Sequence, residues 1–503
     1  MTTELEAKLI PAAGFRIPAL NGMPSGSVTV VDPVRELDAT YYDTPDLELA
    51  RWGITLRHRG GDSGPPWTLK LPAHASRTTL ARDELTFEGA ADAVPADASD
   101  LVRGFTRTSP LNIAARLHTT RAPLHVQEAD GQPLIEIVDD SVEISEGVGE
   151  IDRFREVEVE AMIDSARSRG ALRAAVATLL DAGCSVEPPI PKLVRALGPR
   201  AQLPPSVVAA PVDKHASPTD LIRHLTASSV IQILMHDPGV RLGHDPEAVH
   251  LYRVATRRLR ADYRTFSRML DDVRANELRS ELRWLGQAAG PVRDLDVLGA
   301  RFEVHAHELS DVDQSAASSL LTRLAEARFA AHQRLLVALR SDRYDRTVRM
   351  LVDFAAEPPV AVPARRNAAK PAASFARRLV KKRFKQLAEA VEAAGAVPTD
   401  AQFHQIRIAA KRCRYAAEAI APVAGRPARH FAAAVENVQS VLGGYHDSVV
   451  AEAWLRDAAV DLVDCRIAVG GLIAVERQER ARVARAWPKV WHRASKRKTR
   501  AWL

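Results

Sequence analysis

Residues 250–260 read HLYRVATRRLR, and residues 404–414 read HQIRIAAKRCR. Each stretch places a histidine and then cations three, seven and ten residues later, which keeps these side chains on one face of an α-helix. The residues are His250, Arg253, Arg257 and Arg260 in the first copy and His404, Arg407, Lys411 and Arg414 in the second. Asp262 is the only acid among the arginines of the first copy, and like charges on one helix face repel. The two stretches therefore predict cationic helices that face an anionic partner.

The basic stretches belong to a longer duplication. WLGQAAGPVRDLDVL at 284–298 resembles VQSVLGGYHDSVVAEAWL at 438–455, and Asp294 and Asp447 hold matching places. We expect an all-α domain of two duplicated helical bundles, whose two cationic stripes form one groove if the halves pack around a pseudo-twofold axis. The expected ranges are 217–488 for the domain, about 217–356 and 375–488 for its halves, and 489–503 for a basic C-terminal tail.

The first 198 residues have a different texture. Short segments such as GITLRHR, WTLKLP, DELTFEG and REVEVEA alternate with period two, which is typical of half-buried strands. Residues 199–216 are rich in Pro, Ala and Val without periodicity and are interpreted as a linker. The chain is therefore expected to be an α+β multidomain protein, with a strand-rich domain at 1–198.

Two of the alternating segments are acidic. ELEAK at 4–8 places Glu4, Glu6 and Lys8 on one strand face, and REVEVEA at 155–161 does the same with Glu156, Glu158 and Glu160. Carboxylates repeated on one face need a cation among them, and Mg²⁺ and Mn²⁺ prefer oxygen ligands. Other strands carry cations in the same style, which suits a substrate of metal and linked phosphates.

Composition and the absence of certain motifs exclude several other classes of protein. The net charge of +6 over 503 residues is consistent with an anionic partner, and the three cysteines form no CxxC pair. The start lacks the basic region of a signal peptide, and no apolar run approaches the roughly 20 residues of a membrane span. We expect a cytoplasmic protein. Phosphate-binding GxxxxGK[ST], GxGxxG and zinc HExxH motifs are absent from the sequence.

Residues 1–198 resemble the CYTH family, also called triphosphate tunnel metalloenzymes. The resemblance rests on ELEAK, YYDTPDLELARWGITLRHR at 41–59, WTLKLP, and FREVEVEAM with PKLVRAL after it. It implies an eight-stranded antiparallel tunnel with flanking helices that hydrolyses a triphosphate with Mg²⁺ or Mn²⁺. The implied metal ligands are Glu4, Glu6, Glu158 and Glu160, and the implied catalytic residues are Lys8, Glu4 and Glu6. The implied triphosphate-binding residues are Lys8, Arg57, Arg59, Lys70, Arg82, Arg121 and Lys192.

Residues 217–485 resemble the CHAD domain, a conserved-histidine α-helical domain that binds inorganic polyphosphate. The resemblance rests on the paired basic stretches and on the two aspartate-containing echoes. The implied polyphosphate-binding residues are His250, Arg253, Arg257, Arg258, Arg260, Arg264, His404, Arg407, Lys411, Arg412 and Arg414.

The leading hypothesis is thus a metal-dependent triphosphatase that also binds long-chain polyphosphate. Association with polyphosphate granules is a further expectation from the CHAD resemblance. One alternative is a non-catalytic polyphosphate-binding or targeting protein, and another is a tunnel enzyme for an organic triphosphate such as thiamine triphosphate or ATP. Specific nucleic-acid binding is not expected, because aromatic residues make up only 5% of the chain and do not interleave with the basic helices. No membrane partner is expected, and the sequence identifies no protein partner.

Overall fold

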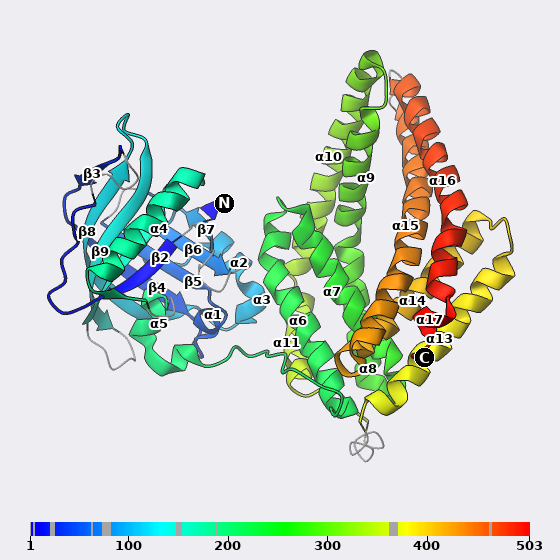
Figure 1. Ribbon diagram of the computed structural model, residues 1–503, viewed down its shortest axis with the longest axis horizontal. Coiled ribbons are helices and arrows are strands. Elements are labelled where there is room, and N and C mark those ends of the chain that lie inside the picture. The colour runs from blue at the N-terminus through cyan, green and yellow to red at the C-terminus, as the bar shows by residue number, and fades with distance from the viewer. Residues whose placement is uncertain are drawn as a thin grey trace. The chain divides into compact units, whose positions relative to one another are not determined.

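The computed structural model divides the chain into two compact units, Met1–Ser206 and Val207–Leu503 (Figure 1). The boundary lies inside the stretch that the sequence predicts as a linker. The structure describes residues 2–503 except for 4–5, 21–25, 62–63, 73–81, 147–152, 187–189, 362–370 and 462–464. Within this described part, no helix is both long and apolar enough to cross a membrane.

The N-terminal unit is built on one antiparallel sheet in the order β1-β7-β6-β5-β4-β8-β9-β10-β2-β11, with β3 paired to β8. Its strands are β1 (Thr2–Thr3), β2 (Glu6–Pro11), β3 (Val28–Val31), β4 (Arg35–Asp43), β5 (Thr55–Gly60), β6 (Trp67–Pro72), β7 (Arg82–Phe87), β8 (Asn112–Gln127), β9 (Pro133–Glu146), β10 (Arg153–Ala161) and β11 (Cys184–Ser185). Its helices are α1 (Glu48–Arg51), α2 (Ala96–Leu101), α3 (Arg103–Thr106), α4 (Ala166–Asp181), α5 (Lys192–Leu197) and the 3₁₀ helix η1 (Gly198–Gln202).

The two ends of this sheet meet. β1 and β2 are two residues apart in the chain, β1 pairs with β7, and β2 pairs with β10. With β1 and β2 taken together, eight of the described strands therefore surround one interior, and β3 and β11 are added outside the ring. A closed sheet has an inner face that neither solvent nor another sheet covers, so side chains fill it. The arrangement confirms the expected antiparallel, sheet-rich N-terminal half.

Strand β10 shows why charged side chains line that interior. Its sequence RFREVEVEA alternates, and neighbouring side chains on a strand point to opposite faces. Val157 and Val159 are fully buried in a core that they share with helix α4 on the outside of the sheet. The alternate residues Glu156, Glu158 and Glu160 consequently point toward the interior.

Helix α5 contributes a lysine to the same interior. Leu193 and Leu197 pack with Tyr41 of β4 and Leu117 of β8 in a second buried core. Because Tyr41 also lines the interior cavity, this packing places the first residue of the helix, Lys192, at the cavity wall. An element after the last long strand thus completes a site built mainly from strands.

The C-terminal unit is all-helical over its described residues, as expected. Its helices are α6 (Pro218–Leu242), α7 (Pro246–Thr265), the 3₁₀ helix η2 (Ser267–Met269), α8 (Asp272–Ala288), α9 (Gly290–Ala306), α10 (Asp311–Leu339), α11 (Asp342–Ala356), α13 (Ala373–Ala394), α14 (Asp400–Ala424), α15 (Arg426–Asp461), α16 (Arg466–Ser495) and α17 (Arg497–Arg500). Figure 1 shows α9 with α10 and α15 with α16 as two long helical pairs.

The two halves of this unit differ at one helix. The second basic helix, α14, is followed by α15, which runs unbroken through Gly443 and Gly444. The matching segment after α7 is divided at Ala289 into α8 and α9. Pro291 accounts for the break, because proline has no N–H and its ring obstructs the preceding turn of a helix, whereas it is tolerated in the first turn of a new one.

The two halves share a core and a buried ion pair. Leu298 and Phe302 of α9 pack with Leu455 of α15 and Leu472 of α16. Beside them, the guanidinium of Arg301 on α9 donates two hydrogen bonds to the fully buried carboxylate of Glu476 on α16, at 2.7 and 2.6 Å. His305 Nδ1 lies 3.0 Å from the same carboxylate. These contacts tie the first half to the second.

The C-terminal residues differ from the expected basic tail. Residues 489–495 continue helix α16, and residues 497–500 form α17. The ring of Trp491 stacks on Phe384 of α13, and the ring of Trp502 meets Phe431 of α15 edge-on. The two tryptophans bury apolar area against the bundle, which orders a segment that its charge alone would leave in solvent.

We predict that Glu476→Ala destabilises the C-terminal unit by about 3–5 kcal/mol, because it leaves the Arg301 guanidinium without its main partner in a largely buried place. Guanidinium unfolding followed by helical circular dichroism measures the change. Glu479→Ala is the control on the same helix: its surface pair with Arg482 is worth less than about 1 kcal/mol. Equal losses in the two variants would contradict the proposed importance of the buried pair.

Candidate functional site

A row of carboxylates crosses three neighbouring strands of the barrel interior. Glu160 of β10 lies directly opposite Glu6 of β2 on one side and Glu136 of β9 on the other. Like charges that face each other across a sheet destabilise it. The pKa of Glu160 is raised to about 7, and burial is the largest cause. Glu6 and Glu136 contribute to the rise, and Lys70 opposes it. The row is therefore an arrangement that an added cation stabilises.

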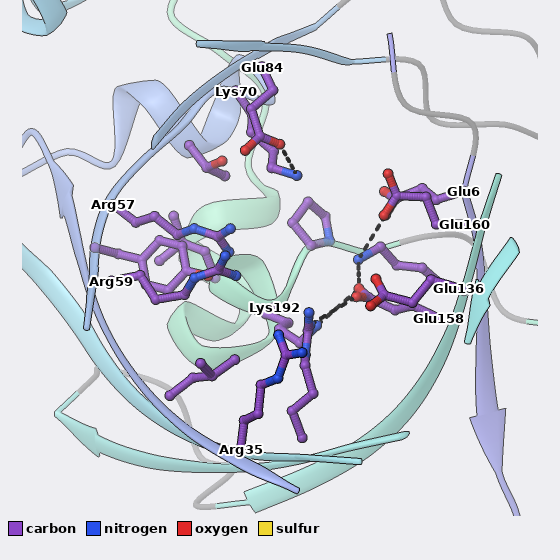
Figure 2. Close-up of a pocket in the computed structure, with 17 residues that line it drawn as sticks. Glu6, Arg35, Arg57, Arg59, Lys70, Glu84, Glu136, Glu158, Glu160 and Lys192 are labelled. Carbon is purple, nitrogen blue, oxygen red and sulfur yellow. Dashed lines mark hydrogen bonds and ion pairs between the residues drawn. The ribbon is translucent and has the colours of Figure 1, made fainter. Parts of the chain in front are cut away.

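Two lysines meet at the next carboxylate of β10. Lys8 Nζ contacts Glu158 and lies 3.8 Å from Glu6, and Lys192 Nζ lies 3.0 Å from Glu158 (Figure 2). Burial favours the neutral acid, but Lys192 and Lys8 outweigh it and hold the pKa of Glu158 well below its usual range. The neighbouring Glu156 behaves oppositely, because burial raises its pKa against the effect of Lys192.

Cationic side chains occupy the opposite wall. Figure 2 shows Arg57 and Arg59 of β5 facing the carboxylates across the interior, with Arg35 below them, whereas Lys192 lies beside Glu158. The space between the walls has a volume of about 240 Å³. An interior with carboxylates on one side and guanidinium groups on the other suits a metal-bound chain of phosphates, since the metal and the cations neutralise different oxygens.

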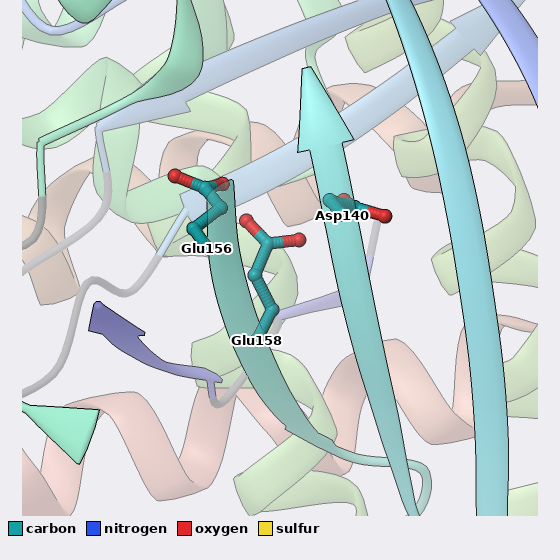
Figure 3. A group of neighbouring side chains, drawn as sticks. All are labelled: Asp140, Glu156 and Glu158. Carbon is teal, nitrogen blue, oxygen red and sulfur yellow. The ribbon is translucent and has the colours of Figure 1, made fainter. Parts of the chain in front are cut away.

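A second acidic group lies beside the first and is compensated within the protein. The carboxylates of Asp140, Glu156 and Glu158 each have an oxygen within 4.8 Å of the others (Figure 3). Lys192 Nζ lies 2.9 Å from Asp140 and 2.7 Å from Glu156, so its ammonium already serves this group. Arg121 adds two hydrogen bonds to Asp140, of 2.9 and 2.7 Å. The carboxylates that better fit a divalent ion are therefore those of the row on β2, β9 and β10, Glu6, Glu136 and Glu160, while Glu158 lies between the two groups.

The C-terminal unit holds a cationic cavity between helices. The two predicted basic helices, α7 and α14, pack against each other. The cavity beside them has a volume of about 180 Å³ and is lined by Arg257, Arg260, Ala261, Arg264, Thr265, Arg383, Ile408, Lys411, Arg412 and Tyr415. Among the described residues, no acidic side chain lines it. Burial, as the largest cause, and the neighbouring charges of Arg257, Arg407, Arg260 and Arg253 together lower the pKa of Lys411 to about 7.

Comparison with known proteins assigns both units. Residues 3–177 match the CYTH domain, and residues 225–456 match the CHAD domain. The uncharacterized proteins MT2285 and Rv2226 of two Mycobacterium tuberculosis strains are each 31% identical over 471 residues, which is 91% of this chain and 89% of theirs. The chain belongs to the CYTH and CHAD families. CYTH proteins include triphosphatases and adenylate cyclases, and both domains are associated with triphosphate or polyphosphate.

Two solved structures are similar to a little more than half of the chain. PptA from Streptomyces chartreusis is 22% identical, with a TM-score of 0.45, and the match covers 55% of this chain and 100% of that one. The CHAD domain from the plant Ricinus communis is 25% identical, with a TM-score of 0.47, and the match covers 57% of this chain and 95% of that one.

The CYTH interior brings together most of the residues that the sequence predicts for it. Glu4 lies outside the described residues, and of Arg82 only the backbone, on β7, is described. The other predicted residues line the cavity: Glu6, Lys8, Arg57, Arg59, Lys70, Arg121, Glu158, Glu160 and Lys192. Besides the contacts of Lys8 and Lys192 with the carboxylates, Lys70 Nζ lies 2.9 Å from Glu84, and Arg121 holds Asp140.

Sequence reasoning missed four residues of this interior: Arg35, Glu84, Glu136 and Asp140. The signal for two of them was present in PLIEIVDD, where Glu136 and Asp140 are four residues apart and so share a strand face. Their importance depends on pairing with β10, which the alternation of a single strand does not disclose.

The CHAD helices separate the predicted residues into two groups. Arg257, Arg260, Arg264, Lys411 and Arg412 line the cavity. The two arginines Arg258 and Arg414 instead pair with Glu418, at 2.7 and 2.6 Å, and Arg414 also pairs with Glu436 at 3.0 Å. They hold α7 to α14 and α14 to α15, and so they serve the walls of the cavity.

The histidines and the first cation of each motif lie apart from the cavity lining. Arg253 donates hydrogen bonds of 2.8 and 2.9 Å to Gly290 O and to Asp294 on α9. The corresponding Arg407 lies against Gly443, where an added Cβ would be 4.0 Å from its Nε. The rings of His404 and His446 are 4.9 Å apart, and burial and Arg293 lower the pKa of His250. What repeats in the two halves is the position of the first cation, since Arg253 lies near Gly290 and Arg407 lies near Gly443.

Proposed function

We propose that the CYTH domain hydrolyses inorganic triphosphate with a divalent metal ion and that the CHAD domain binds long-chain inorganic polyphosphate. The observation that carries the first part is the pair of opposed walls, Glu6, Glu136, Glu158 and Glu160 against Arg57 and Arg59. A protein that only bound an anion would use cations alone, whereas buried carboxylates facing an anionic ligand need a metal between them.

The lining also favours an inorganic substrate over an organic one. Among the described lining residues, Tyr41 is the only aromatic side chain, and most of the others are charged. Its hydroxyl accepts a hydrogen bond of 3.5 Å from Arg57. A thiazole, pyrimidine or adenine ring binds best on apolar or aromatic surface, which this lining does not offer.

The residues of the interior would have three different roles in hydrolysis. Glu6, Glu136, Glu158 and Glu160 would hold a divalent ion, whose chemistry is to neutralise charge on the phosphate oxygens. Arg57, Arg59 and Arg35 hold the remaining oxygens and align the chain. Lys8, placed between Glu6 and Glu158, orients the water whose oxygen bonds to the terminal phosphorus as the bridging P–O bond breaks. The products are orthophosphate and pyrophosphate.

We expect Glu6→Gln combined with Glu160→Gln to lower phosphate release from tripolyphosphate roughly 100-fold or more, because two metal ligands lose their charge. Release is measured with Mg²⁺ and with Mn²⁺. Glu143→Gln, on the exposed part of β9, is the control and keeps native activity. No release by the native protein with either metal would contradict inorganic triphosphatase activity, and the same assay on thiamine triphosphate and ATP would then test an organic substrate.

The CHAD proposal rests on the positive charge of the cavity, whose described lining contains several cations and no acidic side chain. Burial and three other arginines lower the pKa of Arg260, and burial and four lower that of Arg264. Arg383 of α13, which lies outside both motifs, joins the cavity from a third helix. A polyanion in this cavity relieves repulsion among these cations, and a long flexible chain of phosphates reaches cations on all three helices.

Arg383→Ala should weaken binding of long-chain polyphosphate roughly tenfold, because it removes a charge-assisted hydrogen-bond donor from the cavity. Lys382→Ala, which removes the same charge from the exposed face of the same helix, is the control and should change affinity little. Fluorescence anisotropy at fixed salt measures both. Stronger competition by double-stranded DNA than by polyphosphate at physiological salt would contradict the proposed ligand.

Lys411 should make this binding pH-dependent. With its pKa lowered to about 7 in the free domain, the lysine is largely neutral at pH 8, and a bound polyanion favours its charged form. Binding should therefore take up a proton at pH 8, and affinity should fall as pH rises above about 7. Calorimetry in buffers of different ionisation enthalpy measures the uptake. Lys411→Arg, which restores the residue of the first copy, should abolish it; unchanged uptake in this variant would contradict the assignment to Lys411.

A further inference from the structure

A histidine connects the acidic row of the tunnel to a carboxylate on the added strand β3. His125 of β8 lies directly opposite Glu136 of β9 in the sheet. Its Nε2 is 3.2 Å from Glu136 Oε1, and its Nδ1 is 2.8 Å from Asp32 Oδ2. All three side chains are about a quarter exposed or less. Asp32 directly follows β3, and its backbone N–H donates to Pro123 O at 3.1 Å, which fixes it beside His125.

The contacts of His125 with Glu136 and Asp32 form a bridge, and this bridge acts on the carboxylate of Glu136, whose orientation is otherwise unfavourable. Glu136 lines the tunnel and lies opposite Glu160, which in turn lies opposite Glu6. Without a partner, repulsion in this row turns the Glu136 side chain away from its neighbours. The contact between His125 Nε2 and Glu136 Oε1 restrains one oxygen of this carboxylate and leaves the other for a ligand in the tunnel.

Histidine suits this position because both of its ring nitrogens face carboxylate oxygens. Either ring nitrogen, when it carries the proton, is placed to donate to the carboxylate that it faces. A carboxylate behind the imidazole fixes the orientation of the ring, which is how residues outside a metal site commonly orient the groups that bind the metal. The added strand β3 thereby supplies the tunnel with a support that the eight-stranded ring alone lacks.

We propose that His125, backed by Asp32, is a positioning residue that holds Glu136 in the orientation in which it binds the divalent ion. This inference rests on the proposed metal-dependent function, and it concerns a residue that lies beside the cavity lining, next to Glu136.

The same strand supplies a matched control. His118 of β8 also lies between two carboxylates, 2.8 Å from Asp38 and 3.1 Å from Glu36. Those carboxylates are 81% and 56% exposed, and they alternate with Arg35 and Leu37, which line the tunnel. His118 therefore makes the same kind of bridge on the outside of the barrel, where a role toward the metal is not expected.

The test compares the full-length native chain with His125→Ala, His125→Gln and His118→Ala. Mn²⁺ binding is measured by isothermal titration calorimetry without substrate, and tripolyphosphate hydrolysis is measured over a range of Mn²⁺ concentrations. We expect His125→Ala to weaken Mn²⁺ binding roughly 10–100-fold and to raise the Mn²⁺ concentration for half-maximal activity in parallel. His125→Gln, whose amide still donates to Glu136, should recover part of the loss, and His118→Ala should bind as the native chain does.

The outcomes distinguish a failure of this inference from a failure of the proposed triphosphatase function. Native Mn²⁺ affinity in His125→Ala would overturn the inference, even if the protein hydrolyses tripolyphosphate. Equal losses in His125→Ala and His118→Ala, matched by equal falls in melting temperature, would also overturn it, because the bridge would then be merely structural. Weakened Mn²⁺ binding in His125→Ala alone would support the inference, even in a protein that released no phosphate from tripolyphosphate.

Discussion

The repulsion between buried carboxylates on strand β10 is the constraint on which the CYTH domain depends. Val157 and Val159 are fixed in the outer core, so Glu156, Glu158 and Glu160 have only the interior to occupy. Removing charged carboxylates from water is costly unless cations accompany them. Lys8 and Lys192 come from opposite ends of the domain sequence and both contact Glu158. The closed barrel therefore also brings the compensating charges to the buried carboxylates.

Period-two and helical patterns predicted the faces of individual elements well. REVEVEA placed its glutamates inward and its valines outward, and the two basic stretches became the facing helices α7 and α14. What these patterns lack is pairing between elements. Glu136 matters because the sheet register sets it opposite Glu160, and Arg383 matters because α13 packs beside α14. Such neighbours follow from tertiary contacts that a periodicity within one segment does not contain.

A pattern within one segment also predicts some ligand-binding residues that do not line the cavity, because it does not show which partners the fold brings to them. Arg258 and Arg414 fit the spacing of the basic stripes, yet Glu418, one turn beyond the second motif, serves both. Duplication preserves a motif as a whole, whereas each of its cations acquires a role from the residues packed nearby. Pro291 shows this on a larger scale, since one proline divides a helix in one half that the other half keeps whole.

In both domains some charges are compensated within the protein and others are gathered beside charges of the same sign. Asp140 and Glu156 are served by Lys192, and Arg258 and Arg414 are served by glutamates, so these groups stabilise walls. The row around Glu160 and the cavity around Lys411 each gather charge of one sign, and each shifts a pKa to about 7. A fold that tolerates such concentrations gives up stability in the free state, and it regains that stability when a ligand of opposite charge binds. The two sites carry opposite signs, and a metal–phosphate chain is a ligand whose parts match both.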